Sequence, residues 1–158
     1  MARSGSISAI WFARAVSADE HVTTMEVDET YAALARDNLD RAGVTDRVRL
    51  AVGPAAESVR ALIDANEDPF DVILIDADKP NNPIYLEAAL TLSRPATVII
   101  GDNVGRDGAV TDPESAHPRV HGNRALIEAI GRNANLSATA LQTVGLKGWD
   151  GFPIAVFR

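Results

Sequence analysis

The chain has 158 residues, which is enough for one compact domain with one hydrophobic core and too few for two domains of typical size. Aspartate and glutamate number 22 against 15 lysines and arginines, and the resulting acidic surface repels phosphate, which argues against a nucleic-acid partner. There are no cysteines, so disulfides, thiolate metal sites and a cysteine nucleophile are excluded.

No apolar stretch approaches the roughly 20 residues that a membrane helix needs. The first residues show no signal-peptide pattern, because Arg14 interrupts the apolar run. We therefore expect a single cytoplasmic domain over residues 1–158, with no membrane partner.

The first half of the chain alternates between strand and helix patterns. Residues 21–27 and 48–52 predict strands. Between them, Asp28 predicts the N-cap of a helix and Gly43 its end, and Pro54 predicts the first turn of a second helix. The residues expected on the buried faces of these helices are Tyr31, Leu34 and Ala35 in the first, and Val59, Leu62 and Ile63 in the second.

The second half continues this alternation. Residues 71–75 and 96–101 are almost entirely apolar, which is typical of strands covered on both faces of a parallel sheet. Residues 104–122 are rich in Gly, Pro and Asp and predict a long loop, in which a regular helix over 117–121 is not expected. The apolar faces of the helices before and after this loop are predicted to contain Tyr85, Leu86, Ala89 and Leu90, and Leu126, Ile127 and Ile130.

The last two predicted strands cover residues 137–144 and 153–157. Asp150 and Gly151 lie between them and predict the tight turn of an antiparallel hairpin. The whole pattern predicts an α/β fold with an open, mostly parallel sheet. Ligands of such sheets bind at the carboxyl ends of the strands, so that edge is where functional residues are expected.

Two of the predicted strands end in oxygen-rich clusters. Asp76 follows the strand at 71–75, and Asp102 and Asn103 follow the strand at 96–101. If these strands are neighbours, the three side chains can converge, and two carboxylates with one amide oxygen suit Mg²⁺, Mn²⁺ or Ca²⁺. The alternative is that these residues only stabilise the following turns, which is the commoner case for one cluster alone. The presence of two clusters favours a metal site.

Lys79 is a candidate general base or a group that orients a substrate oxygen. The alternative is a surface lysine paired with Asp78. Glu26 ends the first strand about 20 residues after Gly5, a spacing typical of a carboxylate that binds a ribose diol, although acidic residues are common at strand ends. Gly53 and the small residues after it would allow a flat ring to approach, or they only begin a helix.

The chain resembles the bacterial members of the caffeoyl-CoA and catechol O-methyltransferase family from about Ser8 to its end. The IDADK and GDN pair is the most specific part of this resemblance. The similar segments are MEVDETYAALARDNLDRAG, VGPAAESV, PFDVILIDADKPNNPIYLEAAL, VIIGDNV and TVGLKGWDGF.

The resemblance implies a Rossmann-like domain that binds S-adenosylmethionine (SAM) and ends in an antiparallel strand. It implies methyl transfer from SAM to a hydroxyl of a small phenolic or catechol-like substrate, and a homodimer. The implied metal ligands are Asp76, Asp102 and Asn103, and the implied catalytic residues are Lys79 and Asp76. The implied SAM-binding residues are Ser8 near the methionine carboxylate, Glu26 at the ribose, Ala55 and its neighbours at the adenine, and in addition Gly5, Val27, Gly53 and Asp76.

The N-terminal residues MARSGSIS differ from the family's glycine-rich turn, and we expect the fold to lack the family's N-terminal helices and first strand. This expectation leaves two alternatives open. The chain could be a catalytically inactive methyltransferase-fold protein that acts as a dimer or partner-binding module, or a metal-binding α/β domain without methyl transfer.

Overall fold

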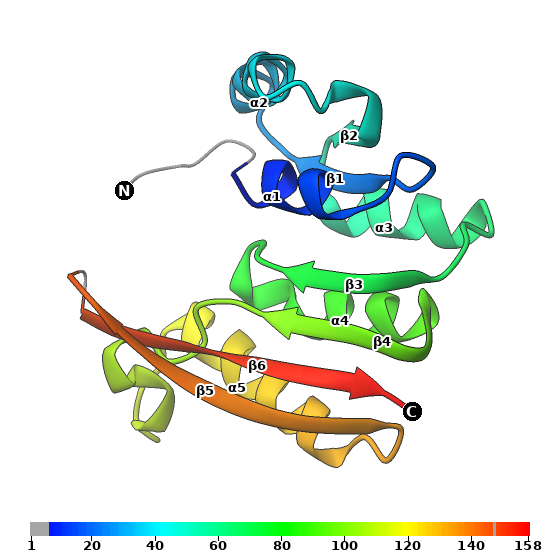
Figure 1. Cartoon of the computed structure of the whole chain (residues 1–158). Coiled ribbons are helices and arrows are strands. Elements are labelled where there is room, and N and C mark those ends of the chain that lie inside the picture. The colour runs from blue at the N-terminus through cyan, green and yellow to red at the C-terminus, as the bar shows by residue number, and fades with distance from the viewer. Residues whose placement is uncertain (1–6, 147) are drawn as a thin grey trace. The chain divides into compact units, whose positions relative to one another are not determined.

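The computed structural model describes residues 7–146 and 148–158 (Figure 1). The chain divides into two compact units, Met1–Ser58 and Val59–Arg158, and each is described by itself. Gly5, one of the predicted SAM-binding residues, lies outside the described residues.

In chain order the elements are α1 (Ile7–Ala15), β1 (Val22–Glu26), α2 (Glu29–Arg41), η1 (Thr45–Arg47), β2 (Val48–Val52), α3 (Ala55–Asp64), β3 (Phe70–Ile75), η2 (Lys79–Asn81), α4 (Asn82–Thr91), β4 (Ser93–Gly101), η3 (Arg106–Thr111), α5 (Pro118–Arg132), β5 (Leu136–Gly145) and β6 (Gly148–Phe157).

The first unit contains a two-stranded parallel sheet of β1 and β2. Both strands lie where the sequence predicts them. Glu26 pairs with Val52, so the carboxyl ends of the two strands are level. A small apolar core forms between α1, α2 and the residues after it, and it consists of Ala9, Ala13, Leu39 and Val44.

Helix α2 begins and ends as predicted. The side chain of Asp28 accepts hydrogen bonds from the backbone N–H groups of Thr30 and Tyr31, and Gly43 has the positive φ of 65° that a helix-terminating glycine adopts. The predicted buried face is wrong at Leu34, which is exposed. The buried stripe instead consists of Ala32, Ala35 and Leu39, which recur at helical spacing.

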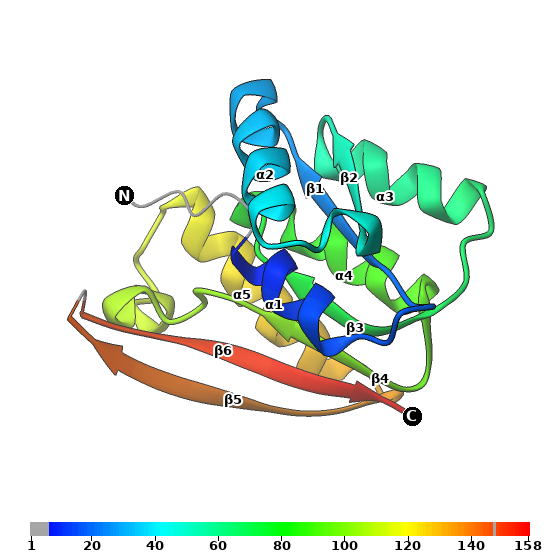
Figure 2. The same cartoon turned by 45° about the horizontal axis from the view of Figure 1, so that its top comes forward.

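The second unit contains a four-stranded sheet in the order β3-β4-β6-β5. Strands β3 and β4 are parallel, whereas β6 pairs antiparallel with both β4 and β5. Helices α4 and α5 lie on one face of this sheet (Figure 2). The predicted α/β fold with a C-terminal antiparallel hairpin is confirmed. The buried residues of this unit include Tyr85, Leu86, Ile99, Leu126, Ile130 and Ala155.

Two details of the strands differ from the prediction. Val72 in β3 is exposed, so the expectation that both faces of this strand are covered is wrong at this position. Strand β4 begins at Ser93 rather than at Ala96, and its pairing with β3 is irregular until Val98. Within this irregular stretch, the hydroxyl of Thr97 donates a hydrogen bond to the carbonyl of Phe70 and so connects β4 to β3.

The predicted loop over residues 104–122 is partly wrong. Its first part forms η3, and α5 begins at Pro118 rather than after Gly122. Proline lacks a backbone N–H, but the first turn of a helix leaves its N–H groups unpaired, so Pro118 begins α5 instead of interrupting it. His117 is the N-cap and accepts a hydrogen bond from the Arg119 N–H.

The C-terminal hairpin is confirmed, but its turn is misplaced in the prediction. Asp150 pairs with Thr143 and Gly151 pairs with Gln142, so both lie inside β6 and the strands continue to Gly145 and Gly148. The longest described helix, α5, has 15 residues, and within the described ranges no helix has the length and apolar character needed to cross a bilayer.

Candidate active site

Strands β3 and β4 end side by side. Ile75 pairs with Gly101, and the Asp102 N–H donates to the Ile75 carbonyl at 3.0 Å. The predicted adjacency of these strands is therefore confirmed. Because Asp76 and Asp102 each follow one of these paired residues, their side chains leave the sheet at the same edge.

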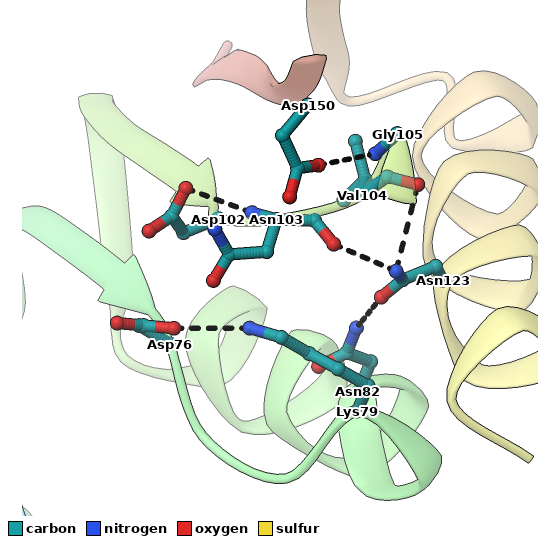
Figure 3. Close-up of polar contacts among 9 residues, drawn as sticks. All are labelled: Asp76, Lys79, Asn82, Asp102, Asn103, Val104, Gly105, Asn123 and Asp150. Atoms are coloured by element: carbon teal, nitrogen blue, oxygen red, sulfur yellow. Dashed lines mark hydrogen bonds and ion pairs between the residues drawn. The ribbon is translucent and has the colours of Figure 1, made fainter. Parts of the chain in front are cut away.

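The Asp102 carboxylate is partly buried and interacts with the charges of neighbouring side chains. Burial raises the pKa of Asp102, the hydrogen bond from the Asn103 N–H lowers it, and the negative charge of Asp76 raises it further, while Lys79 lowers it. In Figure 3 the carboxylates of Asp76 and Asp102 lie on the same side of the site, and the Asn103 amide extends from the end of β4 toward Asp76 and Lys79. The predicted metal ligands therefore surround one region.

Lys79 is held beside these oxygen atoms. Its side chain is only 8% exposed, and its Nζ lies 3.0 Å from Oδ1 of Asp76, which is 50% exposed. The alternative of a surface lysine paired with Asp78 is wrong, because Asp78 accepts hydrogen bonds from Asn81 and Tyr85. Burial and the hydrogen bond to Asp78 raise the pKa of the Tyr85 hydroxyl.

The chemistry of this donor set suits a hard divalent cation. Asp76 uses one oxygen for Lys79, and Asp102 uses one for the Asn103 N–H, so the second oxygen of each has no hydrogen-bond partner within residues 7–146 and 148–158. In the same described ranges, no three or more His, Cys, Asp or Glu side chains gather as a metal site would require. The Asn103 amide oxygen adds a third hard oxygen donor beside the two carboxylates, which is the donor set that the sequence predicts.

Four predicted SAM-binding residues, Glu26, Val27, Gly53 and Ala55, lie at the carboxyl ends of β1 and β2 or directly after them. Glu26 accepts a hydrogen bond from the Asp28 N–H at 3.0 Å, and the next side chain, Val27, is 67% exposed. The Gly53 N–H donates to the Glu26 carbonyl at 2.9 Å. Apart from its two chain neighbours, no atom of the described residues lies within 4 Å of the position that a Gly53 Cβ would occupy. Ala55 begins α3 directly after this open position.

Ser8 lies in the first turn of α1, where it is exposed to solvent. Every predicted site residue except Gly5 therefore falls within the described part of the chain. All of these except Ser8 lie at or near the carboxyl ends of the β1–β2 pair and the β3–β4 pair. Ser8 lies on α1.

Two buried asparagines beside the β3–β4 edge were missed by sequence reasoning. Asn82 donates through Nδ2 to Oδ1 of Asn123 at 3.0 Å, and Asn123 donates through Nδ2 to the Asn103 carbonyl at 2.8 Å. One signal could have found Asn123, because it lies three residues from both Val120 and Leu126, on the buried stripe of α5. A polar residue at a core-facing helix position indicates a specific hydrogen-bonding role.

Asp150 ties the segment after Asn103 to the C-terminal hairpin. Its Oδ1 accepts from the N–H of Gly105 at 2.8 Å and from the N–H of Arg106 at 3.0 Å. The Val104 N–H donates to the Gly151 carbonyl at 2.9 Å. These bonds explain why Asp150 and Gly151 stay within β6 instead of forming a turn.

The chain is similar to known O-methyltransferases over almost its whole length. Residues 4–143 match the O-methyltransferase family. A catechol O-methyltransferase of Niastella koreensis is 44% identical over 151 residues, which cover 96% of this chain and 68% of that protein.

Two solved structures are also similar. An O-methyltransferase of Bacillus cereus in complex with SAH is 51% identical with a TM-score of 0.94, over 98% of this chain and 70% of that one. An O-methyltransferase of Streptomyces achromogenes, involved in tomaymycin synthesis and in complex with SAM, is 40% identical with a TM-score of 0.93, over 97% and 69%. With matches of this extent, the chain belongs to the O-methyltransferase family.

Proposed function

We propose that the chain transfers the methyl group of SAM to a hydroxyl of a small phenolic or catechol-like acceptor, with a divalent cation, preferably Mg²⁺, at the β3–β4 edge. Mn²⁺ and Ca²⁺ are the alternatives. The observation that carries this proposal is the gathering of Asp76, Asp102 and Asn103 beside the buried Lys79. The name of the Niastella koreensis relative supports the catechol-like acceptor class.

In this proposal the two carboxylates and the Asn103 amide hold the cation. A divalent cation bound there would supply Lewis acidity that lowers the pKa of an acceptor hydroxyl. Lys79 acts on the same hydroxyl: as a neutral amine it would receive the hydroxyl proton, and as an ammonium it would orient the oxygen while the proton leaves to solvent. The hydrogen bond from Nζ to Asp76 at 3.0 Å fixes the position of Nζ. The C–S bond of SAM breaks as the C–O bond of the product forms.

The β1–β2 edge is proposed to bind SAM. The second carboxylate oxygen of Glu26 would accept from the ribose diol, since the first one bonds to the Asp28 N–H. The exposed Val27 and the open space at Gly53, close to Ala55 at the start of α3, suit a flat apolar ring such as adenine. Ser8 is proposed near the methionine carboxylate, and Asp76 is proposed to contact the cofactor in addition to the cation.

A homodimer is part of the same proposal, with the cytoplasm as its location. Strand β5 is at the end of the four-stranded sheet, and its residues 137–145 are all exposed. The strand contains no charged residue and no proline, which are the features that protect a sheet edge from pairing with another chain. Light scattering on the purified protein tests this part, and a monomer mass at micromolar concentration contradicts it.

The proposed reaction is tested by calorimetry with SAM and by rate measurements with a simple catechol. We expect SAM to bind with or without Mg²⁺, and we expect methyl transfer to require an added divalent cation. Turnover that continues in excess EDTA contradicts the metal requirement. A folded protein that binds no SAM contradicts the proposed enzyme, and no observation on the described residues favours the inactive or purely metal-binding alternatives.

A further inference from the structure

We propose that Asn123 is a positioning residue for the candidate metal site, acting through the backbone of Asn103. This inference rests on the proposed function, because it concerns the ligands assigned there to the cation. Asn123 lies on α5 and contributes no atom to the donor set. Its side chain is completely buried, with 0% exposure.

The two peptide groups of Asn103 are both hydrogen-bonded. Asn103 has a φ of 53°, in the left-handed region that non-glycine residues adopt only when their surroundings support it. Its N–H donates to Oδ1 of Asp102 at 2.7 Å, and its carbonyl accepts from Nδ2 of Asn123 at 2.8 Å. Both sides of this unusual residue are therefore anchored, and Asn123 provides the anchor that comes from outside the segment.

Helix α5 also contacts the segment that contains Lys79. Asn123 accepts from Nδ2 of Asn82, the first residue of α4 and the residue that follows η2. The neighbouring residue Gly122 brings α5 directly against the same segment, because a Cβ atom built on Gly122 would lie 1.8 Å from the Lys79 carbonyl oxygen. Two consecutive residues of α5 thus contact the segment that contains Lys79 and the segment that contains Asn103. Figure 3 shows the hydrogen bonds of Asn123 to Asn82 and Asn103.

Loss of Asn123 leaves the partly buried Asn103 carbonyl and the buried Asn82 amide without their partner, which favours a local change of conformation. The Asn103 peptide would then be free to leave its left-handed conformation, and the Asn103 amide and the hydrogen-bonded Asp102 carboxylate would lose their orientation. Outer partners that orient metal ligands typically contribute about 10-fold to 100-fold in metal affinity.

The test measures Mn²⁺ binding by electron paramagnetic resonance of the free ion, and SAM binding by calorimetry in the absence of metal. For Asn123→Ala we expect Mn²⁺ affinity to fall at least about 10-fold, with SAM affinity within about 2-fold of wild type, since Glu26 and Gly53 lie on other elements. Ile130→Ala is the matched control. It truncates a buried residue of the same helix that takes no part in these hydrogen bonds, and it should lower thermal stability without changing Mn²⁺ affinity.

Should Asn123→Ala fail to fold, Asn82→Ala decides the question, because it removes the Asn82 hydrogen bond and leaves the one to Asn103. We then expect a smaller fall in Mn²⁺ affinity, still above 2-fold. Folded variants that bind Mn²⁺ as wild type does overturn this inference and leave the proposed function intact. Equal losses of Mn²⁺ and SAM binding also overturn it, and a wild-type protein that binds no Mn²⁺ overturns both proposals.

Discussion

The two strand edges that carry the predicted site residues are supported in different ways. At the β1–β2 edge, Glu26 bonds to Asp28 two residues later and to Gly53 at the end of the adjacent strand. At the β3–β4 edge, the ligand segments bond to Asn123 on α5 and to Asp150 on β6, which are 20 and 45 residues away from their partners. The first edge is shaped by bonds between its own two strands and within the turn after β1, whereas the second also receives bonds from a helix and a strand outside its strand pair.

This difference matches what each edge is proposed to bind. A nucleoside is large and offers several groups, so a carboxylate and an open space suffice to begin a binding site. A small divalent cation requires several oxygen atoms at fixed positions, and that demands rigid support for each ligand. The following variants test whether the two edges function separately, from the largest expected effect to the smallest.

Replacement of Asp102 should abolish metal-dependent turnover at the β3–β4 edge and leave SAM binding at the β1–β2 edge unchanged. We expect Asp102→Ala to reduce Mg²⁺-dependent turnover by about 10³-fold or more, because a cation that stabilises the reaction by several kcal/mol loses a charged ligand. SAM affinity should remain. Initial rates at varied Mg²⁺ and calorimetry with SAM provide the two measurements.

The fold should survive this substitution. Burial and the charge of Asp76 raise the pKa of Asp102, so its ionised form opposes folding when no cation is bound, and this opposition grows as the pH rises through the folded-state pKa. Asp68→Ala, at an exposed carboxylate, is the control and should leave turnover unchanged. Full activity in Asp102→Ala would falsify the assigned site.

Replacement of Lys79 should affect the reaction more than binding. We expect Lys79→Met to lower kcat by roughly 10² to 10⁴-fold, the usual contribution of a positioned proton-transfer group. The affinity for SAM, measured by calorimetry, should stay within about 2-fold of wild type because the β1–β2 edge is unchanged. Parallel losses of rate and SAM binding would instead indicate that the two edges are not independent.

Replacement of Glu26 is the converse experiment on the β1–β2 edge. Glu26→Gln should weaken SAM binding by about 10-fold to 100-fold, the range for one hydrogen bond to a charged group. Mn²⁺ binding should not change. The control is Glu29→Gln in the first turn of α2, three residues later, which alters the same charge at an exposed position. If both variants bind SAM equally well, the ribose assignment is wrong.

Replacement of Gly53 tests the backbone of the β1–β2 edge. Gly53 has a φ of +139°, and the part of the chain that the structure describes leaves the position of its absent Cβ open, so the cost of Gly53→Ala comes from the backbone conformation. We expect a loss of about 1–3 kcal/mol in the free energy of unfolding. Gly131→Ala is the matched control, because Gly131 also has open space but lies in α5, where alanine is favoured by up to about 1 kcal/mol. Urea titration compares the two variants.

The sequence predicts best where contacts are local. The cap at Asp28 and the strand Val48–Val52 follow from neighbouring residues, and both are confirmed. Two apolar strands, each followed by acidic or amide residues, were enough to predict that Asp76, Asp102 and Asn103 lie at one edge of the sheet. The prediction of this edge was possible because parallel strands have their carboxyl ends on the same side.

The failures occur where distant contacts override local preferences. Asp150 and Gly151 are favourable turn residues, yet the N–H groups of Gly105 and Arg106 hold the Asp150 carboxylate within β6. Asn82 and Asn123 lie 41 residues apart, and no spacing rule links them. Pro118 was misjudged for a local reason, since a proline favours a helix start as much as a helix end. The roles of the site residues and the single domain stay predictions.

The close contact at Gly122 has a mechanical consequence. Because α5 touches the Lys79 backbone there without any intervening side chain, the Lys79 segment has little room to shift toward the helix, and the next residue, Asn123, bonds the Asn103 carbonyl to the same helix. A displacement of α5 then moves the lysine and the amide ligand together. The distance between Lys79 and the Asn103 amide would therefore stay nearly constant while thermal motion displaces both.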